Sequence, residues 1–167
     1  MLRFGQMLTE DQAKRVWERM VESEVRSLYF GDMASKNTAR KQIIVGASFF
    51  LSSGAFAALV GHLPVLVPTV CALIVAILTA YSMAVGLERR IGTLTKLHCQ
   101  WNTLFAEYER LWNHWQDEDA EQILQRLVRR ANEVSELGME MPDDEKSIQK
   151  WARIVYARFT PVTPAAA

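Results

Sequence analysis

Histidine and cysteine side chains are the best candidates for metal chemistry in this chain of 167 residues. His98 and Cys99 are adjacent, so on a helix they point about 100° apart and cannot chelate from one face. No pair of Cys or His residues has the spacing of a zinc site. Cys71 and Cys99 are the only cysteines, which excludes a disulfide framework and is typical of a reducing, cytosolic setting. We therefore expect no bound metal and no cofactor.

Carboxylates come in two runs, Asp117-Glu118-Asp119 and Asp143-Asp144-Glu145. Both runs fall between helical patterns, where acidic residues cap free N–H groups and complement the helix dipole. The sequence contains no Gly-x-Ser-x-Gly motif, no glycine-rich phosphate loop and no catalytic-triad spacing. These observations predict that the protein is not an enzyme.

Three arginines, Arg126, Arg129 and Arg130, form a small basic cluster. The cluster is either a solvated helix face or a contact for an anion, a nucleotide or an acidic patch of a partner. The chain as a whole is not basic, because residues 1–42 carry 8 basic and 6 acidic side chains and residues 88–167 carry 11 and 13. A nucleic acid duplex requires a concentrated Lys/Arg footprint, so we do not expect it as a partner.

A run of 45 residues, from Ile43 to Leu87, contains no Asp, Glu, Lys or Arg. About 20 helical residues cross the hydrocarbon core of a bilayer, so the run is long enough for two crossings. Gly61, Pro64 and Pro68 interrupt the helical pattern near its middle. We predict an all-α membrane protein, a two-span transmembrane hairpin (43–60 and 68–87) with a cytoplasmic helical bundle (88–159). An amphipathic helix and juxtamembrane segment (1–42) precede the hairpin, and a disordered tail (160–167) follows.

The flanking charges predict the orientation of this hairpin. The loop between the spans has no charge. Basic residues instead precede the first span and follow the second: Lys36, Arg40, Lys41, Arg89, Arg90 and Lys96. The positive-inside rule then places both termini in the cytoplasm. The spans contain no ionisable acid or base that would mark an ion path, which disfavours a transporter or pump.

Small residues recur along both spans at helical spacing. Ala72, Ala76, Ala80 and Ala84 repeat every four residues in the second span, and Gly46 and Gly54 share a row in the first. Small residues allow close approach of helices in lipid. Either the two rows pack against each other within one hairpin, or one row is a contact between subunits.

The cytoplasmic residues are also helical in pattern. Thr9 and Gln12 form a capping box that opens an amphipathic helix, with Gly31 as its expected end. A second helix is expected to continue the second span without interruption from Leu87 to Trp115. Two further helices follow, one ending near Gly138 and one ending at Phe159. The second helix carries an aromatic seam with alternating spacings of three and four: His98, Trp101, Phe105, Tyr108, Trp112 and Trp115. A bulky aromatic seam favours a helical bundle over a coiled-coil dimer. We interpret His98 as a packed residue that is hydrogen-bonded by a neighbour.

This layout resembles the SLATT group, two-transmembrane effector domains of bacterial nucleotide-signalling conflict systems. The local features that carry the resemblance are Arg40-Lys41 before Ile43, the Gly61-His-Leu-Pro loop, and Glu88-Arg-Arg before the long helix. The resemblance implies a homo-oligomeric effector that permeabilises or disrupts the bacterial inner membrane in anti-phage defence. It also implies that a cytoplasmic sensor protein or a nucleotide signal triggers the effector. The alternative is a non-toxic membrane scaffold whose helical bundle recruits a soluble partner.

Overall fold

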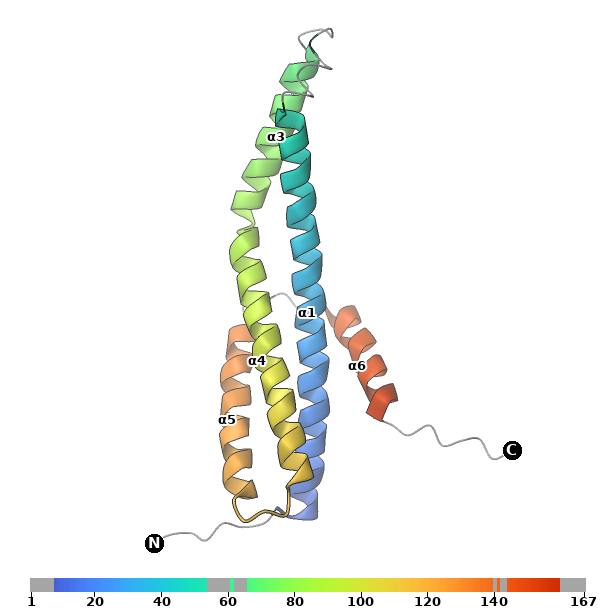
Figure 1. Ribbon diagram of the computed structural model, residues 1–167, viewed down its shortest axis with the longest axis vertical. Helices are drawn as coiled ribbons and strands as arrows, with labels where there is room; N and C mark the ends of the chain where they lie inside the picture. The colour runs from blue at the N-terminus through green and yellow to red at the C-terminus, as the bar shows by residue number, and fades with distance from the viewer. Residues whose placement is uncertain (1–7, 54–60, 62–65, 140, 142–143, 160–167) are drawn as a thin grey trace, which may run out of the picture. The chain divides into compact units, whose positions relative to one another are not determined.

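The computed structural model describes residues 8–53, 61, 66–139, 141 and 144–159. These residues form five α-helices, and no strand occurs among them (Figure 1): α1 (Glu10–Ser52), α3 (Leu66–Ala84), α4 (Leu87–Asn113), α5 (Ala120–Gly138) and α6 (Glu145–Phe159). The predicted all-helical class is therefore confirmed. The expected tail, 160–167, lies outside the described residues.

The chain divides into two compact units. Unit 1 comprises residues 1–32 and 95–167, and unit 2 comprises residues 33–94. Because α1 and α4 each pass from one unit into the other, both units contain part of each of these helices. Unit 1 holds the helical bundle, and unit 2 holds the whole of the uncharged run.

The predicted capping box at the start of α1 is confirmed. The backbone N–H of Thr9 donates to Oε1 of Gln12 over 2.8 Å, and the Gln12 N–H donates to Oγ1 of Thr9 over 3.3 Å. These reciprocal bonds satisfy two N–H groups that the first helical turn leaves free. Next to them, the buried Leu8 donates its N–H to the carbonyl of Trp115 over 3.3 Å, which ties the start of α1 to the end of α4.

The expected end of this helix at Gly31 is wrong, because α1 continues without a break to Ser52. Gly31 occupies an ordinary helical position, and a Cβ atom built there would lie 3.0 Å from Nδ1 of His98. The glycine therefore permits close approach of α1 and α4 in this part of the bundle, rather than ending the helix.

The expected continuous helix from the second span into the bundle is also wrong. α3 ends at Ala84 and α4 begins at Leu87, with Gly86 between them at φ +58°. The Gly86 N–H donates to the carbonyl of Met83 over 3.1 Å, as in helices that end at a glycine. The Gly86 carbonyl accepts from the backbone N–H of Arg90 over 3.0 Å, which is the first hydrogen bond of the next helix. Gly86 therefore ends one helix and opens the next.

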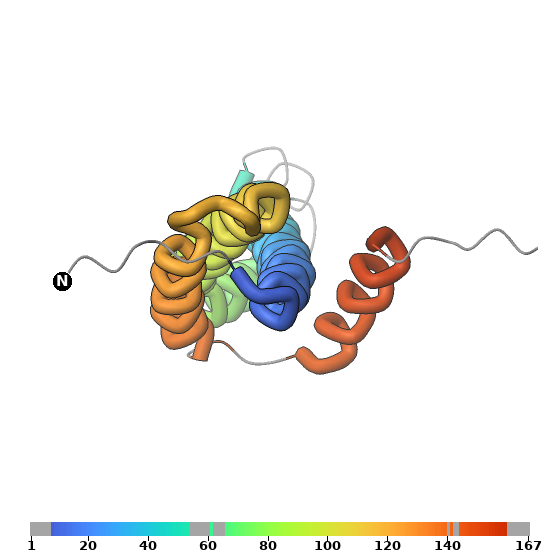
Figure 2. The backbone as a smooth tube through the Cα atoms, turned by 90° about the horizontal axis from the view of Figure 1, so that it is seen from below, coloured from blue at the N-terminus to red at the C-terminus, as the bar shows by residue number. Residues whose placement is uncertain are grey.

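The core of unit 1 lies between α1, α4 and α5. Figure 2 shows α5 on one side of the α1–α4 pair and α6 on the other. α4 contributes a row of buried residues with spacings of three and four: Leu97, Trp101, Leu104, Tyr108 and Leu111. α1 meets this row with Val16, Met20 and Val25, and α5 with Leu127 and Val134. Burial of each large side chain contributes about 1.5–3 kcal/mol.

α5 and α6 begin near the two acidic runs, but only one run caps its helix through a side chain. Asp119 precedes α5 without a capping hydrogen bond from its carboxylate. Before α6, the Asp144 carboxylate accepts from the N–H of Ser147 over 3.3 Å and from its hydroxyl over 2.7 Å. The predicted side-chain cap is therefore observed at Asp144 and is absent at Asp119.

Polar contacts hold α6 against α1 within unit 1. The hydroxyl of Tyr29 accepts from the backbone N–H of Asp144 over 3.0 Å, and the Arg158 guanidinium pairs with Glu24. Burial raises the pKa of Glu24, an effect that the nearby Arg158 cation partly opposes. α6 itself buries only Val155, so fewer apolar contacts hold it than hold α5.

Candidate functional site

Large apolar side chains are exposed on both helices of unit 2 that carry the uncharged run. Their exposed fractions reach 76% at Phe49 on α1, and 73% at Leu66 and 78% at Met83 on α3. No residue of α3 is buried. Contiguous apolar surface of this kind is rare on soluble monomers and marks a site of membrane or protein contact.

α3 is long and apolar enough to cross a membrane, with a mean hydropathy of 2.1, and it alone meets this test among the described residues. It begins two residues before the start of the expected second span and ends three residues before the end of that span. Pro68 lies in its first turn, where the missing N–H of proline costs no helical hydrogen bond. The first expected span, 43–60, forms the last part of α1 as far as Ser52. The remainder of that span lies outside the described residues, so the second crossing stays a prediction.

The alanine row of α3 faces away from the contact within unit 2. Ala72, Ala76, Ala80 and Ala84 are all exposed. The half-buried residues of the helix form a different row: Val67, Cys71, Val75, Leu78 and Ser82. Residues two apart lie about 200° apart around a helix, so Ala80 is almost opposite its neighbours Leu78 and Ser82. The alanine row is therefore free for a contact outside this chain.

The glycine row of α1 is exposed in the same way. Gly46 is exposed, and a Cβ atom built there would meet nothing within 4 Å. Gly54 lies outside the described residues. The half-buried residues in this part of α1 are Ile44, Ala47, Ser48 and Leu51. These positions do not support packing of the alanine row against Gly46 within one hairpin.

The hydroxyl groups of Ser52 and Thr79 in the apolar segments bond to their own helices, whereas the buried hydroxyl of Ser48 has no partner among the described residues. Ser52 donates to the carbonyl of Ser48 over 2.7 Å, and Thr79 donates to the carbonyl of Val75 over 2.8 Å. Bonds of this type satisfy polar groups in an apolar setting without a partner helix. They leave Ser52 and Thr79 less suited to line a polar path.

The six residues of the aromatic seam differ in burial. Trp101 and Tyr108 are buried, with 3% and 0% of their surfaces exposed, whereas the other four are only half buried: His98, Phe105, Trp112 and Trp115. Trp101 and Tyr108 share the buried row with Leu97, Leu104 and Leu111, each of which lies one position before a seam residue. Burial raises the pKa of Tyr108 to about 12.

His98 is a packed residue of the α1–α4 contact. Its Nδ1 atom lies 2.8 Å from the carbonyl oxygen of Ser27 and 3.2 Å from the Ser27 hydroxyl. A carbonyl can only accept, so Nδ1 is the donor in this hydrogen bond. This geometry agrees with the interpretation of His98 as a residue hydrogen-bonded by a neighbour.

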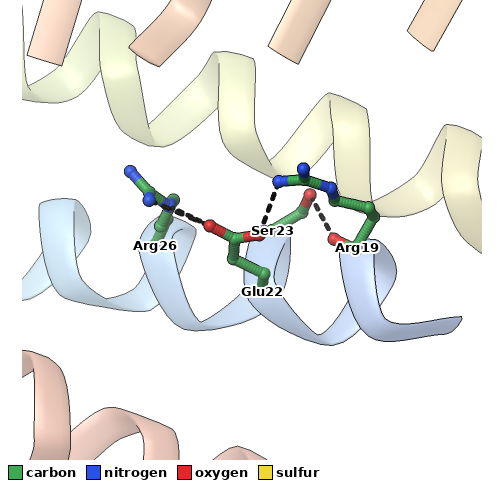
Figure 3. A network of polar contacts seen from close by, with 4 residues as sticks. All are labelled: Arg19, Glu22, Ser23 and Arg26. Carbon is green, nitrogen blue, oxygen red and sulfur yellow. Dashed lines mark hydrogen bonds and ion pairs between the residues drawn. The ribbon is translucent and has the colours of Figure 1, made fainter. Parts of the chain in front are cut away.

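Four side chains of α1 form a polar network (Figure 3). The Glu22 carboxylate pairs with Arg19 over 3.0 Å and with Arg26 over 2.9 Å, while the Ser23 hydroxyl donates to the Arg19 carbonyl. The Arg26 guanidinium carbon lies 5.0 Å from the ring centre of Trp101, within the range of a cation–π contact. The network therefore helps to pack α1 on α4.

The predicted arginine cluster divides between an ion pair, a cavity and the surface. Arg130 pairs with Glu107 of α4 over 2.6 Å. Arg126 and Arg130 line a cavity of about 540 Å³ between α4 and α5, which is also lined by Arg110 of α4 and by His114 just after the end of α4. Arg129 is exposed and does not line it. Asp117, Asp119 and Glu107 also line this cavity, so its charges are mixed and do not select an anion.

An aromatic groove at the start of α1 was not foreseen from the sequence. Trp17, Trp112 and Trp115 line a hollow of about 420 Å³, together with Ala13 and the stems of Glu10 and Lys14. Each of the three indoles is half buried. The heptad spacing placed Trp112 and Trp115 on one face, but the contribution of Trp17 depends on how α1 and α4 align.

Comparisons with protein-family models, with curated proteins and with solved structures found no match.

Proposed function

We propose that this chain is a membrane effector whose two apolar segments cross the bacterial inner membrane and whose other helices form a cytoplasmic bundle. The observation that carries the proposal is the exposed apolar surface of α3 and of the end of α1. Keeping each such side chain in water rather than in an apolar medium costs about 1.5–3 kcal/mol. A bilayer removes that cost along the whole segment.

The charges at the base of the apolar segments support the proposed orientation. Lys41 on α1 and Glu88 on α4 form an ion pair of 2.6 Å, which sets the two helices at a common level just outside the uncharged run. Basic residues surround this level, and the positive-inside rule assigns such a level to the cytoplasm. Both termini then lie in the cytoplasm, and Gly61 lies near the outer face.

Self-association through the alanine row supports an effector that acts by permeabilising the membrane. Two helices cannot enclose a pore, so any permeation requires several copies. Ala76 and Ala80 are exposed on the face of α3 opposite its contact within unit 2, where close helix packing in lipid is favoured. The resemblance to the SLATT group supports a role in anti-phage defence, with the bundle receiving a signal from a sensor protein or a nucleotide.

The test measures membrane potential in bacteria after induced expression, with a depolarisation-sensitive dye. Ala80→Leu adds bulk to the alanine row, and Val70→Leu is the matched control because Val70 is exposed on the same helix outside that row. We expect wild type and Val70→Leu to collapse the potential and Ala80→Leu to preserve it at equal membrane insertion. Collapse by Ala80→Leu would exclude the alanine row as the subunit contact.

A membrane scaffold is the second candidate, and the aromatic groove favours it. Half-buried tryptophans in a hollow are suited to anchor a partner's apolar side chain. If wild type is inserted and the potential stays intact, permeabilisation by this chain alone is contradicted and the scaffold is favoured. Trp112→Ala is then the variant that tests recruitment of a partner through the groove. Trp101 is buried in the core, so its replacement would change the stability of the fold instead.

A further inference from the structure

Unit 2 has a strongly uneven distribution of charge. It contains five basic residues, which we call the basic collar: Lys36, Arg40, Lys41, Arg89 and Arg90. Glu88 is its single acidic residue, whereas the chain as a whole has 19 residues of each sign. Unit 2 is therefore cationic by four charges and unit 1 is anionic by the same amount. Three of the five precede the uncharged run and two follow it, and the Lys41–Glu88 contact brings the two groups to the same end of the paired helices.

The single acid of unit 2 does not neutralise the collar arginines. Glu88 accepts a hydrogen bond from Nζ of Lys41 over 2.6 Å, and this contact holds the pKa of Glu88 below its ordinary value. Glu88 is thus committed to Lys41. Within the described residues, no ion pair or side-chain hydrogen bond engages the guanidinium groups of Arg40, Arg89 or Arg90, and Nε of Arg90 is buried without a partner.

The three arginines lie at one level of the two helices. Arg40 directly precedes Lys41, and Arg89 and Arg90 directly follow Glu88, so all three are within two residues of the Lys41–Glu88 contact. The exposed apolar surface begins close by, with Ile43 on α1 and Met83 on α3. If these apolar residues lie in hydrocarbon, the arginines lie where lipid phosphates are.

We propose that Arg40, Arg89 and Arg90 form a binding site for the phosphate of an anionic phospholipid on the cytoplasmic side. Guanidinium groups bind phosphate through paired, charge-assisted hydrogen bonds. A lipid satisfies the site better than a free phosphate, because its acyl chains also cover the exposed apolar side chains beside the collar. The inference rests on the proposed membrane insertion of the hairpin.

Lipid binding is tested by native mass spectrometry of the full chain in uncharged detergent, with phosphatidylglycerol and phosphatidylcholine of equal chain length. Each basic residue near the lipid phosphate strengthens binding by about fivefold. We therefore expect Arg40→Gln/Arg89→Gln/Arg90→Gln to weaken phosphatidylglycerol binding by about 100-fold. Phosphatidylcholine binding should weaken much less, because the choline cation offsets the charge of its phosphate. The matched control removes three exposed arginines of unit 1: Arg126→Gln/Arg129→Gln/Arg153→Gln.

Three further results bear on the assignment. Equal loss in both triple variants, or no preference of wild type for phosphatidylglycerol, would overturn the site. Displacement of the lipid by inorganic phosphate would assign the site to a free anion instead, and we expect no displacement.

Circular dichroism confirms folding of each variant. Alkaline carbonate extraction separates this inference from the proposed function, because release of wild type from membranes contradicts insertion, whereas retention without lipid preference contradicts the site alone.

Discussion

Replacing two glycines of one segment by alanine is expected to change stability in opposite directions. Gly86 lies between α3 and α4 at φ +58°, whereas Gly92 lies inside α4, where a Cβ atom would meet nothing within 4 Å. The two substitutions are chemically identical. Any difference between them therefore reports the backbone conformation at each position.

The magnitudes follow from backbone preferences. Alanine in place of glycine in a helix interior is stabilising by about 1 kcal/mol, which is the expectation for Gly92→Ala. An alanine held in the left-handed region costs roughly 1–2 kcal/mol, which is the expectation for Gly86→Ala. The two variants should thus differ by roughly 2–3 kcal/mol in free energy of unfolding. For a chain of this size, that is roughly 4–12 °C in Tm.

Thermal unfolding of both variants in neutral detergent, followed by circular dichroism, measures this difference. Wild type should unfold between the two, with Gly86→Ala lower and Gly92→Ala higher. If Gly86→Ala instead raises Tm as much as Gly92→Ala does, the helix passes through Gly86. In that case the continuous helix expected from the sequence is correct and the break between α3 and α4 is not.

Three further substitutions test the interior of unit 1. Tyr108→Phe removes a buried hydroxyl that has no hydrogen-bond partner among the described residues. It should therefore stabilise the fold by about 1 kcal/mol in thermal unfolding, and a loss would reveal an unseen partner. Burial raises the pKa of Glu24 above its ordinary value of 4.5, so the folded state binds this proton more tightly, and wild type should lose stability as pH rises from 4.5 through the raised pKa. Glu24→Gln should remove that part of the slope, and an unchanged slope of denaturation against pH would refute the assignment. Gly31→Ala should lower Tm despite the better helix propensity of alanine, because its Cβ displaces the His98 ring from the Ser27 carbonyl. A rise in Tm like that of an open helical glycine would contradict the close approach.

Local signals predicted most helix ends. Two of these signals are short-range hydrogen-bonding patterns: the capping box of Thr9 and Gln12, and the cap of Ser147 by Asp144. Such patterns can be predicted without knowledge of a partner helix. Gly31 and Gly86 show the limit of that approach. Both glycines follow apolar helical residues. Gly31 lies inside α1 and permits its close approach to α4, whereas Gly86 ends α3. The difference lies in the neighbouring helix and the backbone angle, which the residue type does not encode.

The sequence predicted which residues share a row at the candidate contact surfaces, but not which of these rows are exposed and which are buried. The spacing of four identified Ala72 to Ala84 as one row, and only the packing of α3 shows that this row is exposed. Likewise, the heptad pattern identified the aromatic face of α4, but it did not show that Trp101 and Tyr108 are buried while Phe105 and Trp112 are only half buried. The neighbouring helices decide which side chains of that face are covered.

Cysteine labelling in spheroplasts tests the central claim, that the hairpin crosses the inner membrane with the bundle in the cytoplasm. The reagent is a bulky, polymer-linked maleimide that does not cross membranes. Cys99 is exposed on α4 and is retained alone in Cys71→Ser. Gly61, exposed between the two apolar segments, becomes the single cysteine in Gly61→Cys/Cys71→Ser/Cys99→Ser. We expect labelling at position 61 in intact spheroplasts and labelling of Cys99 only after the membrane is opened. Labelling of Cys99 in intact spheroplasts, or protection of position 61 until lysis, would contradict it.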